Sequence, residues 1–473
     1  MIYGIVLAIV VGTLLVVTLI KTLSVKNQAD FLVAGRKLAW PVLVFTLLSS
    51  WIGAGSLFAG AENAYRNGFA ALWQPAGGWV GLVVIALIAG RARRFAQFTV
   101  PDLLETRYNA TARVMGTIAI VISYTVITSY QFKGGGDILN LIFPQISRDQ
   151  GMCIIAAFVI VFTAAAGMAS IAYLDLIIGA LVTTIVIIAI PLLLDRAGGW
   201  GHVTAVLPPS HFQVLGNITL PQALNFMIPT MLLLIGNQGM YQKFFSARSE
   251  QDAKFAVYGW IIGTLLLETL LVTVAVIGSS MFQTEHPREI IPITAFKGLP
   301  SLIGAILLGG VFAKVISTAN NYLFSPATNL IHDVYGRFIN RQASEKRRLV
   351  MARVIVIVLG LFALLQATRF ESILNAAVYA YTVYGAAVTP AVMAVFFWKR
   401  ATTMAAIVSI VLGAGITVWL NLVGYELAIY PALGASVVSL VVISLLSAPP
   451  SPEKWKPFFE SDYANQRNSK SAA

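Results

Sequence analysis

Residues 49 to 56 combine hydroxyl side chains with two glycines inside an apolar stretch of the chain. The segment reads SSWIGAGS, from Ser49 to Ser56. Gly53 and Gly55 weaken a helix at a place where a membrane span should be regular. Because hydrocarbon cannot satisfy the carbonyl and amide groups of an unwound turn, such a break persists only where it lines a cavity or holds an ion. We therefore predict that this segment forms a site for a solute and a cation.

A second set of hydroxyl groups lies in the sequence KVISTANN, residues 314 to 321. Ser317 and Thr318 follow Lys314 by three and four positions, so in a helix the three residues share one face, with Asn321 one turn beyond Ser317. Hydroxyl groups that meet the carbonyls of an unwound turn form an all-oxygen environment that suits a small hard cation. The alternative is that these hydroxyls bond only to the preceding turn of their own helix.

Three further ionisable residues lie within apolar segments, where an unpaired charge is costly. Asp175 is the only acidic residue of its segment before the end of that segment. Lys133 precedes three glycines, which favours an ammonium group that anchors a solute carboxylate; the alternative is an ion pair with Asp137, four positions later. Glu268 meets the same condition as Asp175, but no neighbouring motif assigns it a role.

The composition indicates which elements must position these residues. The chain has 473 residues, of which 58% are hydrophobic and 11% charged, and its mean hydropathy is +0.80. These values exclude a soluble fold and predict an all-α integral membrane protein. Thirteen segments are apolar enough to span a membrane: about 2 to 20, 41 to 60, 69 to 90, 114 to 139, 151 to 167, 170 to 194, 221 to 241, 256 to 281, 300 to 331, 349 to 367, 371 to 397, 402 to 424 and 428 to 447.

The basic residues predict the orientation of these spans. With the N-terminus outside, the loops that face the cytoplasm, including Lys243, hold 24 of the 32 Lys and Arg residues, and only six lie in outside loops. The positive-inside rule therefore predicts a cytoplasmic C-terminus in a multi-pass cell (inner) membrane protein. Because the net charge of +12 gathers at span ends, it does not indicate a nucleic-acid partner.

A second interruption, GNQG at residues 236 to 239, follows Pro229 in the seventh span. Its position matches that of the first break if two groups of five spans are repeats, which is typical of transporters built from inverted repeats. The alternative is that glycines are simply common in packed membrane helices. The chain would then divide into an extra span and linker at 1–38, a first repeat at 39–220, a second at 221–400, two further spans at 401–447 and a mobile cytoplasmic tail at 448–473. A short helix is expected after Thr99, which can cap it, on the inner face.

Taken in order, these motifs resemble the sodium/solute symporter family, which includes symporters of proline, pantothenate, sialic acid and sugars. The motifs are the 51–56 break, Thr99-Val100-Pro101 with Glu105 and Arg107-Tyr108, Gln131-Phe132 with Gly134-Gly135, Asp175, Asn237-Gln238 with Gln242-Lys243, and Ser317-Thr318. The resemblance implies thirteen spans around a five-plus-five inverted-repeat core of leucine-transporter type.

The resemblance also implies site residues. The sodium ion would be held by the carbonyls of Ser49, Ile52 and Lys314 and the hydroxyls of Ser317 and Thr318, supported by Asp175. A second sodium would lie at Asn320 and Asn321. The implied solute contacts are Trp51, Gly53, Gly55, Ser56, Gln74, Gln131, Lys133, Asn237 and Gln238.

Two positions depart from the family pattern. Ile178 stands where the family often has Gln, and Lys314 stands where it usually has a small residue. The Lys314 ammonium could occupy the place of sodium, and transport would then be uncoupled or proton-driven. Alternatively, only its carbonyl is used and the side chain turns to a polar neighbour or a water-filled path.

We expect a secondary active transporter, coupled to sodium or alternatively to protons, that imports a small polar solute such as an organic acid or amino acid. The preference for an acid depends on Lys133 alone. The partners would be the solute and membrane lipid, and the protein would be a monomer. No enzyme is expected, because the four histidines lie in loops or at span ends. Two competing hypotheses are a nutrient receptor of the same fold and a channel.

Overall fold

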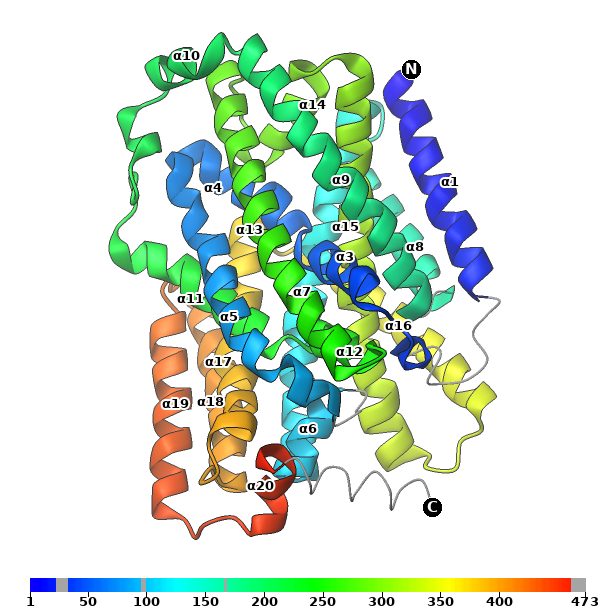
Figure 1. Cartoon of the computed structure of the whole chain (residues 1–473), viewed down its shortest axis with the longest axis vertical. Coiled ribbons are helices and arrows are strands. Elements are labelled where there is room, and N and C mark those ends of the chain that lie inside the picture. The colour runs from blue at the N-terminus through cyan, green and yellow to red at the C-terminus, as the bar shows by residue number, and fades with distance from the viewer. Residues whose placement is uncertain (23–32, 95–98, 166–167, 461–473) are drawn as a thin grey trace.

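The computed structural model describes residues 1–22, 33–94, 99–165 and 168–460, and it is built of helices (Figure 1). In these ranges eleven helical stretches are long and apolar enough to cross a membrane, and two shorter apolar helices occupy Ile2–Val17 and Trp40–Trp51. The expected all-α membrane fold is confirmed, whereas the number of thirteen spans stays a prediction.

The α-helices follow one another along the chain as α1 (Ile2–Thr22), α3 (Trp40–Trp51), α4 (Gly60–Asn67), α5 (Trp73–Arg94), α6 (Val100–Arg107), α7 (Ala110–Ile142), α8 (Arg148–Ala165), α9 (Met168–Arg196), α10 (Gly199–Val206), α11 (Leu220–Gly236), α12 (Gln238–Ser246), α13 (Glu250–Met281), α14 (Ile290–Gly298), α15 (Ser301–Asn329), α16 (Glu345–Ala367), α17 (Ile373–Phe397), α18 (Thr403–Leu422), α19 (Ile429–Leu446) and α20 (Pro452–Phe459).

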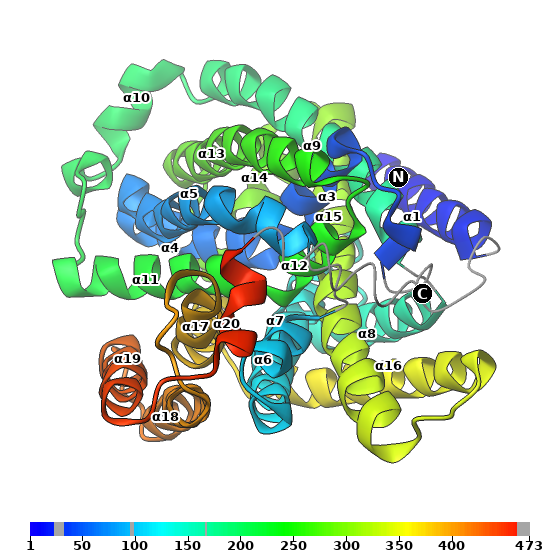
Figure 2. The same ribbon diagram turned by 60° about the horizontal axis from the view of Figure 1, so that its bottom comes forward.

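Two helices form the centre of the bundle. The most apolar stretches around α15 and α17 are 83% and 89% buried, whereas those of α16 and α19 are 28% buried. Helix α15 packs against α7, α9 and α1, and α17 packs against α7, α11 and α18. In Figure 2, α16, α18 and α19 lie at the edge of the bundle. Exposed apolar side chains on these outer helices, such as Leu361 and Val438, suit contact with lipid.

Both predicted helix breaks are present. Helix α3 ends at Trp51, and the chain resumes as a π-helical turn at η2 (Gly55–Ala59), with Ile52 at ψ 102° between them. Helix α11 ends at Gly236, and Asn237 at ψ 112° separates it from α12. Both connecting residues therefore leave the helical region in the same way. The two breaks agree with paired repeats, but the repeat boundaries stay a prediction.

The ends of the bundle confirm one expectation and correct another. Thr99 caps α6, and its hydroxyl and the Asp102 carboxylate form a reciprocal capping box, as expected for the short helix. The tail is not mobile throughout, because residues 452–459 form α20 and Phe458 packs edge-on against Phe396. Residues 461–473 lie outside the described residues. Figure 1 shows α6 and α20 at the end of the bundle opposite to α10.

Candidate functional site

The break after α3 faces α15 with its backbone carbonyls. The Thr318 hydroxyl lies 3.3 Å from the carbonyl oxygen of Ser49 and 3.4 Å from that of Ile52. The neighbouring Ser317 hydroxyl bonds the Asp175 carboxylate of α9. Residues from three helices that were expected to share a sodium site therefore do lie together. Oxygen atoms of this kind are the ligands that hard cations prefer.

Asp175 is fully buried and accepts hydrogen bonds from several neutral donors. Thr46 donates at 2.6 Å, Ser50 at 3.3 Å and the Asn321 amide at 3.4 Å. These donors stabilise the carboxylate charge away from water. The sequence did not indicate Thr46, because a threonine inside an apolar helix has no distinguishing pattern.

Two lysines lie near Asp175. Lys243 is fully buried in α12 and donates to the Asn321 side-chain oxygen at 2.7 Å. Its assignment to a cytoplasmic loop was wrong, because the chain continues as a buried helix after the second break. Lys314 is also fully buried, interacts electrostatically with Asp175, and its ammonium has no hydrogen-bond partner in the described part of the chain.

The two adjacent asparagines of α15 face different neighbours. The Asn320 side chain contacts the Thr163 hydroxyl of α8, whereas Asn321 faces Asp175 and Lys243. The second sodium site, predicted at both residues, therefore has its two side-chain oxygens turned toward separate partners, and it stays a prediction.

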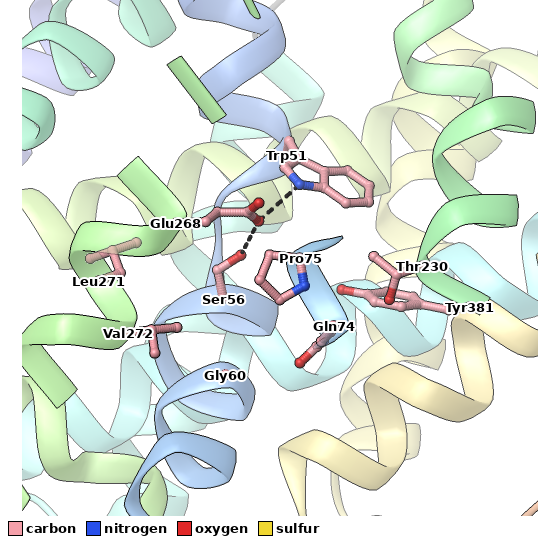
Figure 3. A pocket seen from close by; sticks show the side chains of 10 residues that line it. All are labelled: Trp51, Ser56, Gly60, Gln74, Pro75, Thr230, Glu268, Leu271, Val272 and Tyr381. Carbon is pink, nitrogen blue, oxygen red and sulfur yellow. Dashed lines mark hydrogen bonds between the residues drawn. The ribbon is translucent and has the colours of Figure 1, made fainter. Parts of the chain in front are cut away.

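A cavity lies on the other side of the same break (Figure 3). Its volume is about 20 Å³, and its lining residues are Trp51, Ser56, Gly60, Gln74, Pro75, Thr230, Glu268, Leu271, Val272 and Tyr381. Trp51, Ser56 and Gln74 had been expected at the solute site. A larger hollow of about 340 Å³ opens between the ends of α11, α17, α18 and α19, and no residue of either break lines it.

The structure places Glu268 beside the first break, a position that the sequence around it did not indicate. Its Oε1 accepts hydrogen bonds from Trp51 Nε1 at 3.0 Å and from the Ser56 hydroxyl at 3.3 Å. Its Oε2 accepts one from Trp79 Nε1 at 3.1 Å. Figure 3 shows the carboxylate between Trp51 and Ser56. The carboxylate therefore ties α13 to the broken helix, and the only sequence signal for it was a charge within an apolar span. Nothing in the sequence indicated Tyr381 or Thr230.

Gly53 and Gly55 allow neighbouring helices to approach the break closely, and Gln131 binds its backbone. A methyl group added at Gly53 would lie 2.5 to 2.7 Å from side-chain atoms of Thr318, so only glycine permits this approach. A methyl group at Gly55 would lie 2.5 Å from the Tyr381 hydroxyl. Gln131 accepts a hydrogen bond from the Ala54 amide at 2.8 Å, which satisfies a backbone group that the break leaves free.

Asn237 and Gln238 lie at the second break and do not line the cavity described above. Asn237 accepts a hydrogen bond from the Tyr124 hydroxyl at 2.9 Å and donates to Tyr322 at 3.1 Å. The Gln238 side chain accepts from the amide of Val100 at the start of α6. Both side chains therefore hold the second break against its neighbours.

Lys133 does not point to the cavity. Its ammonium donates to the backbone carbonyl of Phe370, before α17. The expected alternative, an ion pair with Asp137, is not present among the described residues, because Asp137 pairs instead with Arg288 at 2.8 Å and with Arg148 at 3.4 Å. The anchoring of a solute carboxylate by Lys133 therefore has no support in the geometry.

A charged cluster closes the end of the bundle near α6. Arg113 at the start of α7 pairs with Asp102 and Glu105 of α6 and, at 3.3 Å, with Asp333 after α15. Arg337 also pairs with Glu105, at 2.7 Å. His332, Asp102 and Asp333 have the donor types of a metal site, but Arg113 already supplies positive charge to both carboxylates.

A membrane bundle with two broken helices, in which carbonyl and hydroxyl oxygens meet on one side of the first break and a cavity lies on the other, has the architecture of a secondary transporter. A sequence profile of the sodium:solute symporter family matches residues 31–413, so the chain belongs to this family. Members of this family are multi-pass membrane transporters that couple transport to a cation, and not enzymes.

The relatives agree with this assignment. The chain is 25% identical to the sodium/proline symporter of Escherichia coli (strain K12), over 93% of this chain and 92% of that one. It is 23% identical to the high-affinity proline transporter PutP of Bacillus subtilis (strain 168), over 90% and 94%. The structure of a Na⁺-coupled sialic acid symporter in its substrate-bound outward-open state superposes with a TM-score of 0.82 at 16% identity, covering 95% of this chain and 98% of that one. The resemblance seen in the motifs is therefore confirmed.

Proposed function

We propose that this protein imports a small polar solute together with sodium, through alternating access in which the two repeats move about the broken helix. The solute would occupy the cavity beside Trp51 and Glu268, and sodium would bind between the carbonyls of the break and the hydroxyls of α15. The protein would act as a monomer in the cell membrane, with the N-terminus outside. The names of the relatives, which include sodium/proline symporters, support an amino acid as one solute to test.

The observation that carries the proposal is that one broken turn serves both sites. The carbonyls of Ser49 and Ile52 face the Thr318 hydroxyl, and the Trp51 and Ser56 side chains face the cavity. A cation that binds the carbonyls therefore fixes the turn that the solute contacts, which is the physical basis of positive coupling.

Sodium binding can be tested without knowledge of the solute. Saturable binding of ²²Na⁺ to the purified protein is expected for wild type, and Thr318→Ala should weaken it by about tenfold or more, because one oxygen ligand is lost. Thr117→Ala is the matched control, because the Thr117 hydroxyl is equally buried and donates only to its own helix at Arg113. Equal sodium binding by Thr318→Ala and wild type would contradict this site.

Transport itself is tested by uptake of labelled L-proline and other small amino acids and acids into proteoliposomes. A sodium gradient should drive accumulation, and a proton gradient alone should not. Uptake that saturates and shows counterflow separates a carrier from a channel or a receptor. Absence of counterflow for every solute of the panel would contradict the proposal.

A second candidate is a transporter in which the Lys314 ammonium replaces the sodium ion. The observation that favours it is a fully buried ammonium near Asp175 without a hydrogen-bond partner in the described residues. In that case wild type should bind no ²²Na⁺, uptake should ignore a sodium gradient, and Lys314→Ala should create a sodium site. If wild type binds sodium and Lys314→Met preserves that binding, only the carbonyl of residue 314 is needed.

A further inference from the structure

Glu268 is a buried carboxylate without a cationic partner among the residues that the structure describes. It is 4% exposed, and its hydrogen bonds come from Trp51, Trp79 and Ser56, which are all neutral donors. Asp333 differs in this respect, because Arg113 lies within ion-pair distance of it, and Asp175 differs because it interacts electrostatically with Lys243 and Lys314. A carboxylate in the membrane interior is costly unless a cation or proton meets it.

The cavity also contains polar groups that can accept a further hydrogen bond. Gln74 is 5% exposed, and its side-chain oxygen is buried without a hydrogen-bond partner in the described part of the chain. The Thr230 hydroxyl donates to the carbonyl of Phe226, at 2.7 Å, and the Tyr381 hydroxyl lies 3.3 Å from that of Tyr130. None of the ten lining residues is basic. The cavity therefore offers unused acceptors and one negative charge.

From this we infer that the transported solute carries a positively charged nitrogen, which donates hydrogen bonds to Glu268 and Gln74. The inference rests on the proposed function only in taking this cavity as the solute site. A cationic nitrogen offsets the unfavourable burial of the Glu268 carboxylate, whereas an anion without such a nitrogen is repelled by it. The cavity of about 20 Å³ has room for about one water molecule, so the side chains that line it must move apart to admit a small amine or amino acid. The selecting residue is then Glu268, and not Lys133.

The test is a binding panel on the purified full-length protein, read as the shift of its thermal unfolding midpoint with added compound. L-Proline, pyrrolidine, L-alanine and putrescine carry an ammonium group, whereas cyclopentanecarboxylate, lactate and glucose do not. Compounds of the first group should raise the midpoint and those of the second should not. L-Proline and cyclopentanecarboxylate have nearly the same shape, so the difference between their midpoint shifts measures the contribution of the ring nitrogen.

The variants assign the effect to the carboxylate. Glu268→Gln should weaken binding of the ammonium compound by about 10- to 100-fold, the usual range for a charged hydrogen bond. Glu268→Asp, which keeps the charge, should retain part of the affinity and shows that loss does not come from misfolding. Glu371→Gln removes an exposed carboxylate outside the cavity and should bind as wild type does.

The inference is overturned if nitrogen-free compounds stabilise the protein better, if no ammonium compound of the panel stabilises it, or if Glu268→Gln binds as well as wild type. These outcomes are distinct from failure of the proposed function. Sodium-driven uptake of lactate or glucose would sustain symport and refute the ammonium preference. Glu268-dependent binding of an amine without any uptake would support the ammonium preference and refute symport.

Discussion

The side chain of Thr318 packs directly against Gly53, and the Thr318 hydroxyl lies 3.3 Å from the carbonyl oxygen of Ser49. Helix α15 can approach the break this closely only because residue 53 has no side chain. The same contact thus explains why the first break contains glycine and why a threonine hydroxyl faces its carbonyls. The glycine that weakens the helix is therefore also the residue that lets α15 approach the candidate cation site.

Gly53→Ala should therefore separate α15 from the break. The added methyl group would lie 2.5 to 2.7 Å from three atoms of Thr318, so the helices must shift. We expect a loss of about 1 to 3 kcal/mol in the free energy of unfolding, as for other overpacked cores, and at least about tenfold weaker ²²Na⁺ binding. The measurements are thermal unfolding and sodium binding of the purified variant.

Gly415→Ala is the control for this variant. A methyl group at Gly415, in α18, meets no atom within 4 Å, and alanine is the better helix former. This variant should be as stable as wild type or slightly more stable, with unchanged sodium binding. If the two variants lose stability equally, the close approach at Gly53 is not the cause.

The features of this fold that follow from backbone chemistry in lipid are predictable from the sequence. Glycines and hydroxyls within an apolar run predict a break, and the structure has one at Ile52 and another at Asn237. Spacing along a helix placed Ser317 and Thr318 on the face that meets the first break. These predictions succeed because helix periodicity and the cost of free backbone groups in lipid are local properties.

Contacts between distant helices could not be predicted in the same way. Glu268 faces Trp51 across more than two hundred residues, and only the fold brings them together. Lys133 was assigned to the solute because of its neighbours in sequence, but the nearest acceptor in space is the carbonyl of Phe370. The glycines after Lys133 instead admit α8, since a methyl group at Gly136 would touch the backbone of Met152.

Lys133→Met tests this correction. The ammonium contacts a backbone carbonyl near the end of α16 and not the cavity, so solute affinity should change by no more than about twofold. Gln74→Ala, which removes a buried acceptor of the cavity, should weaken binding of the same ammonium compound more strongly. The measurement is the concentration of compound that half-saturates the thermal shift. A large loss in Lys133→Met alone would restore the sequence-based assignment.

The cluster around Arg113 should contribute strongly to stability. Asp333 is fully buried, and Arg113 lies 3.3 Å from it while also pairing with Asp102 and Glu105. Arg113→Ala leaves these carboxylates without their shared cation, and loss of one partner of a buried ion pair costs about 3 to 5 kcal/mol. Arg337→Ala is the control, since its side chain is 48% exposed and such pairs contribute about 0 to 1 kcal/mol. Equal unfolding midpoints for the two variants would contradict the central role of Arg113.

The contact between Gly55 and Tyr381 allows a sharper test of the cavity, because the second residue can compensate for the first. A methyl group at Gly55 would lie 2.5 Å from the Tyr381 hydroxyl oxygen but 3.8 Å from the ring carbon that carries it. Gly55→Ala alone should therefore weaken solute binding and destabilise the protein by about 1 to 3 kcal/mol.

Tyr381→Phe removes the hydroxyl and loses only its contact with the Tyr130 hydroxyl. Combined, the two substitutions should restore most of the stability, with a coupling energy of about 1 kcal/mol or more in a double-mutant cycle of thermal unfolding. Additive effects of the two substitutions would mean that the broken helix and α17 do not meet at this point.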